Sequence, residues 1–179
     1  MAETEPGLTL EYILLGLLRE QPDHGYALFE RVQSTPELSL IWQVKRSKLY
    51  YLLEKLADEG LLSSQVEQGE GYPDRKIYHL TESGRDAFQR WLLEPVSVSR
   101  YVRIAFLSKL YFALQMERNV PQGLIASQLA VCQRWLEDLE RQEAEVPAGD
   151  FISRQVFRFR IGQISAMISW LKECRDQIP

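Results

Sequence analysis

Cysteine and histidine are scarce in this chain of 179 residues, which has two of each. His24 and His79 have no partner at metal-ligand spacing and no Cys-x-x-Cys pair occurs, so the sequence predicts neither a metal centre nor another cofactor. Cys132 and Cys174 lie far apart on helical patterns. This placement indicates small core residues rather than a secreted disulfide framework, and a reducing cytoplasm is the compartment we expect.

Sequence signatures of catalysis and of membrane insertion are also missing. The chain has no Gly-x-Ser-x-Gly motif, Walker loop or Rossmann glycine pattern, and Gly69-Glu70-Gly71 lacks the strand-to-helix setting of a phosphate cradle. Its longest apolar run, residues 12–18, is much shorter than the roughly 18–20 residues that span a bilayer. We therefore expect a protein that is no enzyme and that is neither exported nor embedded in a membrane.

Neither sign of charge dominates the chain. The 21 basic and 25 acidic side chains give a formal net charge of −4. Residues 1–95 hold 10 Lys and Arg against 16 Asp and Glu, or −6, while residues 96–179 hold 11 against 9, or +2. A general attraction to nucleic acid is therefore excluded, and any such role must depend on local clusters of cations.

Apolar spacing predicts three short helices in the first third of the chain, followed by two strands and a fourth helix. The third helix ends at Gly60, the residue type that best adopts a left-handed conformation after a helix. Thr9 and Thr81 are available as N-caps of the first and fourth helices, and residues 38–44 are predicted to be extended. A turn-rich loop, residues 68–75, separates the strands of a hairpin. The predicted helices are 8–20, 25–34, 47–59 and 82–93, and the predicted strands are 61–67 and 76–80.

The C-terminal half is predicted to be helical and to form a dimer. Residues 100–117 are apolar nearly all round, so a helix there must be buried on several sides. Residues 121–145 and 150–177 carry apolar seams too short for a free-standing coiled coil. Since three helices cannot easily enclose an apolar member, we expect a second subunit to cover it. The predicted fold is mainly α: a winged helix-turn-helix with a two-stranded β wing over residues 1–94, then a helical dimerisation domain over residues 95–179.

The helix-turn-helix order followed by a hairpin suits DNA, because a helix fits the major groove and a wing reaches the backbone. The leucines of the third helix point inward, so polar and aromatic residues at its start face outward. Glu54 and Asp58 further along would repel phosphate, so only the first turns are expected to enter the groove. The predicted DNA-binding residues are Lys45, Arg46, Ser47, Lys48, Tyr50, Tyr51 and Lys55 on the helix and Arg75 and Lys76 on the hairpin.

Three motifs in residues 8–90 resemble those of the PadR family of bacterial transcriptional regulators. They are His24-Gly25-Tyr26, the helix end Leu56-Ala57-Asp58-Glu59-Gly60-Leu61-Leu62, and the run from Arg75 to Arg85, RKIYHLTESGR. The resemblance implies a dimeric winged-helix repressor that binds operator DNA and is released by a small molecule. It also implies that His24-Gly25-Tyr26 is a structural turn, and helical spacing predicts that Tyr26 is buried. Arg46-Ser47 departs from the Pro-Gly of many relatives, adding a cation and a hydroxyl able to cap the helix.

A second interpretation is a winged-helix module that binds a protein or senses a ligand, with weak or no DNA binding. The −6 charge of residues 1–95 motivates it. Trp42, Trp91, Trp135 and Trp170 are candidates for lining an aromatic pocket, although Trp91 and Trp135 fall on apolar helix faces where core packing is the commoner role. A coherent strip of positive charge favours DNA, whereas acids that interrupt the strip favour the second interpretation.

Overall fold

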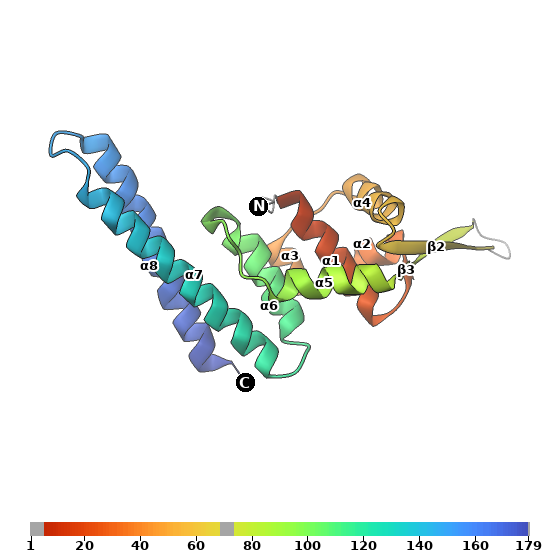
Figure 1. Cartoon of the computed structure of the whole chain (residues 1–179). Helices are drawn as coiled ribbons and strands as arrows, with labels where there is room; N and C mark the ends of the chain where they lie inside the picture. Colours follow the sequence, from red (N-terminus) through yellow and green to blue (C-terminus); the bar gives the residue numbers. More distant parts are fainter. Residues whose placement is uncertain (1–5, 69–73, 179) are drawn as a thin grey trace.

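The computed structural model describes residues 6–68 and 74–178, and helices dominate it (Figure 1). The N-terminal part contains α1 (Pro6–Glu20), β1 (Asp23–His24), α2 (Gly25–Ser34), α3 (Pro36–Ile41), α4 (Arg46–Asp58), β2 (Leu62–Glu67), β3 (Arg75–Leu80) and α5 (Glu82–Leu93). The C-terminal part contains a 3-10 turn (Ser99–Tyr101), a π-helical turn (Val102–Phe106), α6 (Leu107–Ala113), α7 (Asn119–Ala144) and α8 (Phe151–Gln177). The predicted mainly helical fold with a small β wing is confirmed.

The sheet contains the predicted hairpin and one strand that the sequence did not indicate. Strands β2 and β3 pair antiparallel from Leu62 opposite Leu80 to Glu67 opposite Arg75. Strand β1 pairs with the other edge of β3, with His24 opposite Ile77, so the strand order is β1-β3-β2. The tip of the predicted loop, including Gly69-Glu70-Gly71, lies outside the described residues. The short β1 anchors the start of α2 to the base of the wing.

Local capping explains why α2, α4 and α5 lie close to their predicted ranges. His24 caps α2, because its Nδ1 accepts the Ala27 N–H at 3.0 Å, which gives the predicted structural turn a physical cause. Thr81 Oγ1 accepts the Gly84 N–H at 3.0 Å, so the predicted cap of α5 is confirmed. Gly60 has a φ of 73°, as a left-handed residue after α4 requires. The predicted cap Thr9 is wrong, since α1 begins at Pro6 and Thr9 is buried within it.

The prediction of an extended stretch over residues 38–44 is wrong, because most of it belongs to α3. Pro36 occupies the first turn of this helix, where a missing N–H costs nothing, and Glu37 follows it at the positive helix end. The Trp42 N–H donates to the Leu38 carbonyl and closes the helix. A six-residue apolar segment carries too little periodicity to separate a helix from a strand.

Residues 100–117 are buried as predicted, but not for the predicted reason. The segment is not one helix: it passes through the 3-10 and π-helical turns into α6. Its apolar side chains pack against α1, α3, α5 and α7 of the same chain, and Phe106 and Phe112 are fully buried there. One continuous hydrophobic cluster therefore runs from α1 to α8. Most of the cover of this segment therefore comes from the same chain, although Leu114 is 50% exposed.

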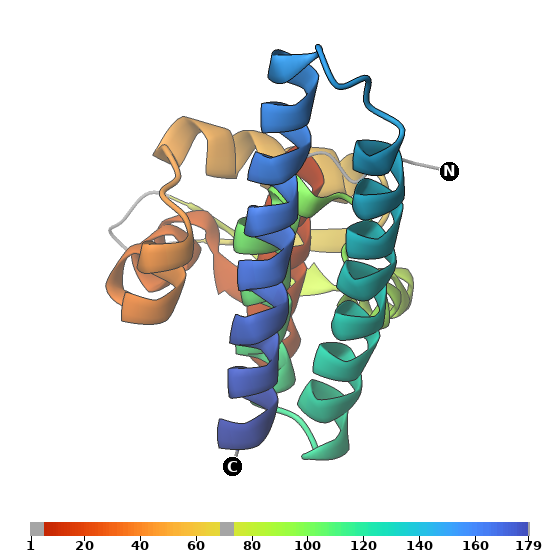
Figure 2. The same cartoon turned by 90° about the vertical axis from the view of Figure 1, so that its left-hand side faces the viewer.

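Helices α7 and α8 form an antiparallel hairpin beside the rest of the molecule (Figure 2). The predicted seam of α8 is confirmed, since Ile164, Ile168 and Leu171 are buried. A second apolar stripe on α8 faces away from the core: Ile152 is 69% exposed, Val156 51% and Phe159 68%. We call these three residues the outer stripe of α8. None of the helices in residues 6–68 and 74–178 combines the length and apolar character that a membrane span requires.

Candidate nucleic-acid interface

Helix α4 has one buried face and one face open to solvent, as a DNA-reading helix needs. Its leucine stripe is buried in the core. Tyr50 is 38% exposed and Tyr51 is 59% exposed. Tyr50 also lines a surface hollow between α4, α2 and the wing. Lys45, Arg46, Ser47 and Lys48 are also exposed, which agrees with their predicted orientation. Ser47 lies inside the helix and Lys45 occupies the N-cap position without a side-chain cap, so the hydroxyl does not act as a cap.

Aromatic rings hold two of the cations at this helix end. The Lys48 Nζ lies 4.8 Å from the centre of the Tyr51 ring. The Arg46 guanidinium carbon lies 5.3 Å from the ring centre of Tyr26 and 5.2 Å from that of Phe29. The prediction that Tyr26 is buried is wrong, since it is 50% exposed beside Arg46. Cation–π contacts across α2 and α4 leave no periodic signal in a sequence, so this role of Tyr26 was missed.

Glu54 connects α4 to the wing. Its carboxylate accepts a hydrogen bond from Lys76 Nζ at 2.6 Å and another from the Tyr78 hydroxyl at 2.5 Å. The hydrogen bond from Lys76 is the main cause that lowers the pKa of Glu54, and burial is the main cause that raises the pKa of Tyr78. Glu54 therefore does not stand as the free anion that the sequence suggested. It fixes the position of β3 against α4.

Lys55 has a different partner from the other predicted cations. Its Nζ lies 2.8 Å from Oε1 of Glu11, whose side chain is only 7% exposed, and 3.6 Å from Oε1 of Glu59. The hydrogen bond to Glu11 is the main cause that raises the pKa of Lys55. This lysine neutralises a buried carboxylate of α1 and ties α4 to that helix.

A hollow of about 370 Å³ lies between α2, α4 and the wing. Gly25 forms part of its wall, and a Cβ there would lie 2.7 Å from the Tyr50 ring, so a larger residue would displace this ring. The hollow brings the wing cations Arg75 and Lys76 beside Tyr50 of α4, which is far from them in sequence. Its lining residues are His24, Gly25, Tyr26, Tyr50, Asp74, Arg75, Lys76 and Tyr78.

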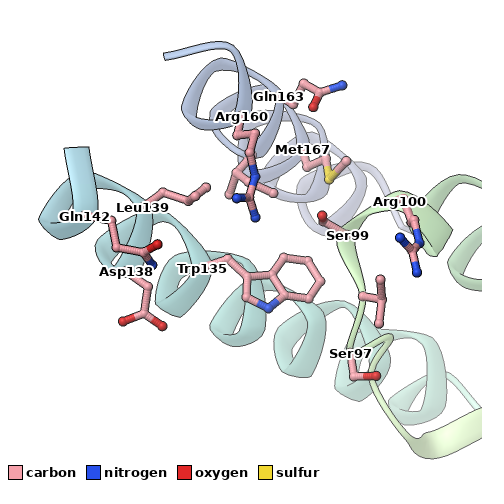
Figure 3. A pocket seen from close by; sticks show the side chains of 12 residues that line it. Ser97, Ser99, Arg100, Trp135, Asp138, Leu139, Gln142, Arg160, Gln163 and Met167 are labelled. Atoms are coloured by element: carbon pink, nitrogen blue, oxygen red, sulfur yellow. The ribbon is translucent and has the colours of Figure 1, made fainter. Parts of the chain in front are cut away.

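Two further hollows flank the connector between α5 and the 3-10 turn, and both are lined by Ser97 and Val98. The larger, of about 390 Å³, is lined by Trp135 of α7 and Arg160 of α8, which point into it from opposite sides (Figure 3). The smaller, of about 210 Å³, is lined by buried Trp91 and by Lys109. Trp91 and Trp135 thus pack against the core and also line a hollow.

The remaining candidates for chemistry are few. Cys132 is buried and Cys174 partly buried, and burial raises the pKa of both thiols, as expected of core cysteines. Within the described ranges, no three His, Cys, Asp or Glu side chains gather as metal ligands would.

Comparison with known proteins identifies the family. Residues 14–90 match the model of the transcriptional regulator PadR-like family, and residues 102–178 match that of the virulence activator alpha C-terminal domain. The negative transcriptional regulator PadR of Bacillus subtilis is 32% identical over 131 residues, which are 73% of this chain and 71% of that protein. A probable transcriptional regulator of Mycobacterium tuberculosis is 28% identical over 93 residues, which are 52% of this chain and 48% of that protein.

Solved structures of Bacillus subtilis PadR are also similar. Its complex with operator DNA is 27% identical, with a TM-score of 0.48, covering 95% of this chain and 99% of that one. Its complex with p-coumaric acid is 26% identical, with a TM-score of 0.44, covering 97% of each chain. The relatives named above are transcriptional regulators, which confirms the predictions of a regulator and of a protein that is not an enzyme. On these sequence matches, the chain belongs to the PadR-like family of transcriptional regulators.

Proposed function

We propose that the protein represses transcription by binding operator DNA as a homodimer, with α4 in the major groove and the wing on the phosphate backbone. The observation that carries this proposal is the hollow in which the wing residues Arg75 and Lys76 meet Tyr50 of α4. A helix and a wing held at one hollow by Glu54 form a surface that spans a groove and its bordering strand. In this scheme residues 1–94 bind DNA and residues 95–179 dimerise.

Two properties of a relative support repression as the direction of regulation and operator DNA as the target. The Bacillus subtilis relative is described as a negative regulator, and that protein has been crystallised with operator DNA. In a bacterial cell the DNA lies in the cytoplasm, so a protein with the proposed function acts in the cytoplasm, the compartment expected from the sequence. The acidic charge of the N-terminal half opposes DNA binding in general, so the proposal depends on the local cluster of cations at the start of α4 and on the wing.

The outer stripe of α8 supports a dimer. Its three residues are spaced by four and three positions, so they form one continuous apolar line along the helix. Exposed apolar lines of this kind mark protein interfaces. We propose a second copy of this chain as the occupant, because twofold assembly buries the same stripe on both protomers and presents two copies of α4 to a palindromic operator.

The salt dependence of DNA binding tests the interface. Six cations of each protomer are predicted to meet DNA: Lys45, Arg46, Lys48, Lys55, Arg75 and Lys76. If about half of these cations in a dimer neutralise a phosphate, the slope of log K against log salt is about −5, because each contact contributes about −0.9. We expect Arg75→Ala, which removes one arginine from each protomer, to lower affinity equally on all duplexes and to reduce the slope by about two units, the mark of backbone contacts. Operator sequences come from selection among random duplexes, and fluorescence titrations at several salt concentrations give the slopes.

Arg134→Ala is the matched control, since Arg134 is an exposed arginine of α7 outside the hollow, and its slope should equal that of the wild type. A wild-type slope near zero would remove these cations from the phosphates. The protein-interaction or ligand-sensing module would then be the better interpretation.

We also propose that a small carboxylate held beside Lys109 weakens DNA binding. Lys109 is 3% exposed, its Nζ donates to the Glu94 carbonyl at 2.5 Å, and it lies 5.1 Å from the centre of the Trp91 ring. Burial lowers the pKa of Lys109 to about 8, so the ammonium is still charged at pH 7. Among the described residues no acceptor meets the buried Trp91 Nε1–H. A buried cation and an N–H donor on one hollow suit a carboxylate.

p-Coumaric acid, the ligand crystallised with Bacillus subtilis PadR, is the probe for this site. We expect it to lower operator affinity of the wild type, and we expect Lys109→Met to bind it about tenfold more weakly or worse, because a charged hydrogen bond is lost. Calorimetry measures both. Lys172→Met, an exposed lysine of α8, should bind like the wild type. Equal binding by Lys109→Met would place the ligand elsewhere, with the hollow of Figure 3 the next to test.

A further inference from the structure

Arg46 differs from the other cations of the candidate interface in how its side chain is held. It is the first residue of α4, and the two rings beside it, Tyr26 and Phe29, both belong to α2. Lys48 by contrast lies against Tyr51 of its own helix, and Lys55 and Lys76 are paired with carboxylates. Arg46 is therefore positioned by a different helix from the one that carries it.

A cation–π contact has a specific consequence for a guanidinium. The attraction to a ring does not require the N–H groups as hydrogen-bond donors, so they remain able to bind a planar partner. An arginine that is already held in place also loses less conformational freedom when it binds. The planar fork of the guanidinium can bind two oxygens of a phosphate. It is also well suited to the edge of a base, where two parallel hydrogen bonds must align.

The position of Arg46 agrees with such a role. The N-terminal residues of a recognition helix are those that contact base edges in the major groove. The partner that a bidentate arginine recognises there is guanine, through O6 and N7. Arg46 and Tyr26 are both exposed, so the guanidinium edge is accessible from solvent.

We propose that Arg46 is a specificity-determining residue that reads a guanine in each half of the operator, and that Tyr26 and Phe29 are its positioning residues. This inference rests on the proposed function. It goes beyond it by assigning one base contact to one side chain and by giving the two rings of α2 a part in sequence choice.

Selection from random duplexes by the full-length protein and its variants tests the proposal. Arg46→Lys keeps the charge but loses the planar fork, so we expect one symmetric pair of guanine positions to lose its preference. We expect the affinity for the wild-type operator to fall about 5- to 150-fold for each half of the operator, while the salt slope and the affinity for scrambled DNA stay unchanged. Arg134→Lys is the matched control, the same substitution at an exposed arginine of α7 outside the candidate interface, and should select the wild-type sequence.

The roles of Tyr26 and Phe29 are tested by base preference, a measurement that a merely structural role of the two rings would not change. Tyr26→Leu and Phe29→Leu should relax the preference at the same guanine positions as Arg46→Lys, whereas Tyr26→Phe keeps the ring and the preference. A merely structural role would instead lower the thermal midpoint and leave base preference intact. If Arg46→Lys selects the same bases as the wild type, the proposal is overturned. A wild-type protein that binds duplexes but enriches no sequence overturns it too, and one that binds no duplex contradicts the proposed function itself.

Discussion

Gly84→Ala is expected to lower the free energy of unfolding by about 3 kcal/mol or more. Gly84 lies in the first turn of α5, where its N–H donates to Thr81. A Cβ at this position would overlap the carbonyl oxygen of Leu61 and would lie 2.8 Å from Cδ1 of Leu80. The carbonyl belongs to the backbone that leads into β2, and it also accepts hydrogen bonds from Thr81. Neither neighbour can yield without disturbing the base of the wing.

Urea denaturation followed by circular dichroism measures this effect. Gly123→Ala is the matched control, because Gly123 is exposed in α7 and a Cβ there meets nothing within 4 Å. It should raise the free energy of unfolding by up to about 1 kcal/mol, the difference in helix propensity between the two residues. Equal stability of Gly84→Ala and the wild type would show that α5 does not approach β2 as closely as described.

Phe159→Glu is expected to raise the dissociation constant of the dimer at least about 100-fold. The substitution places a carboxylate at the C-terminal end of the outer stripe of α8, and an unpaired charge buried between protomers costs several kcal/mol. A monomer presents one α4 instead of two, so affinity for a palindromic operator should fall with it. Sedimentation equilibrium measures the first effect and fluorescence titration the second.

The core should not be affected by this substitution, since Phe159 is 68% exposed within the protomer. Ser165→Glu introduces the same charge at an exposed position of α8 outside the outer stripe and should leave the dimer intact. A Phe159→Glu protein that stays dimeric would exclude the outer stripe as the contact. A wild-type monomer at micromolar concentration would exclude the dimer.

Sequence patterns located helices well where a cap or a glycine fixed the boundary. His24, Thr81 and Gly60 each make a local contact or conformation that their residue type dictates, so α2, α4 and α5 could be placed to within about a residue. The six residues of α3 offered no such periodicity. The cover of residues 100–117 could not be deduced either, because it is supplied by α1, α3 and α5, which precede it in the chain.

The candidate interface could be predicted in part for similar reasons. The exposed residues of α4 follow from the position of its leucines, so their orientation was accessible from spacing alone. Contacts between side chains distant in sequence were not. Glu54 with Lys76, Lys55 with Glu11, and Arg46 with Tyr26 depend on how the wing, α1 and α2 pack on α4. Charge counts over residues 1–95 therefore did not show which of the predicted cations are already paired within the chain.

The carboxylate of Glu54 acts as a built-in counterion for the wing. In the proposed complex, a phosphate that takes the place of Glu54 at Lys76 leaves this carboxylate without its lysine partner, so the broken pair reduces the affinity gained. The cations condensed on the DNA are still released, so the dependence of affinity on ionic strength still counts that phosphate. The salt slope therefore counts phosphates, whereas the affinity also includes the free energy needed to separate Lys76 from Glu54.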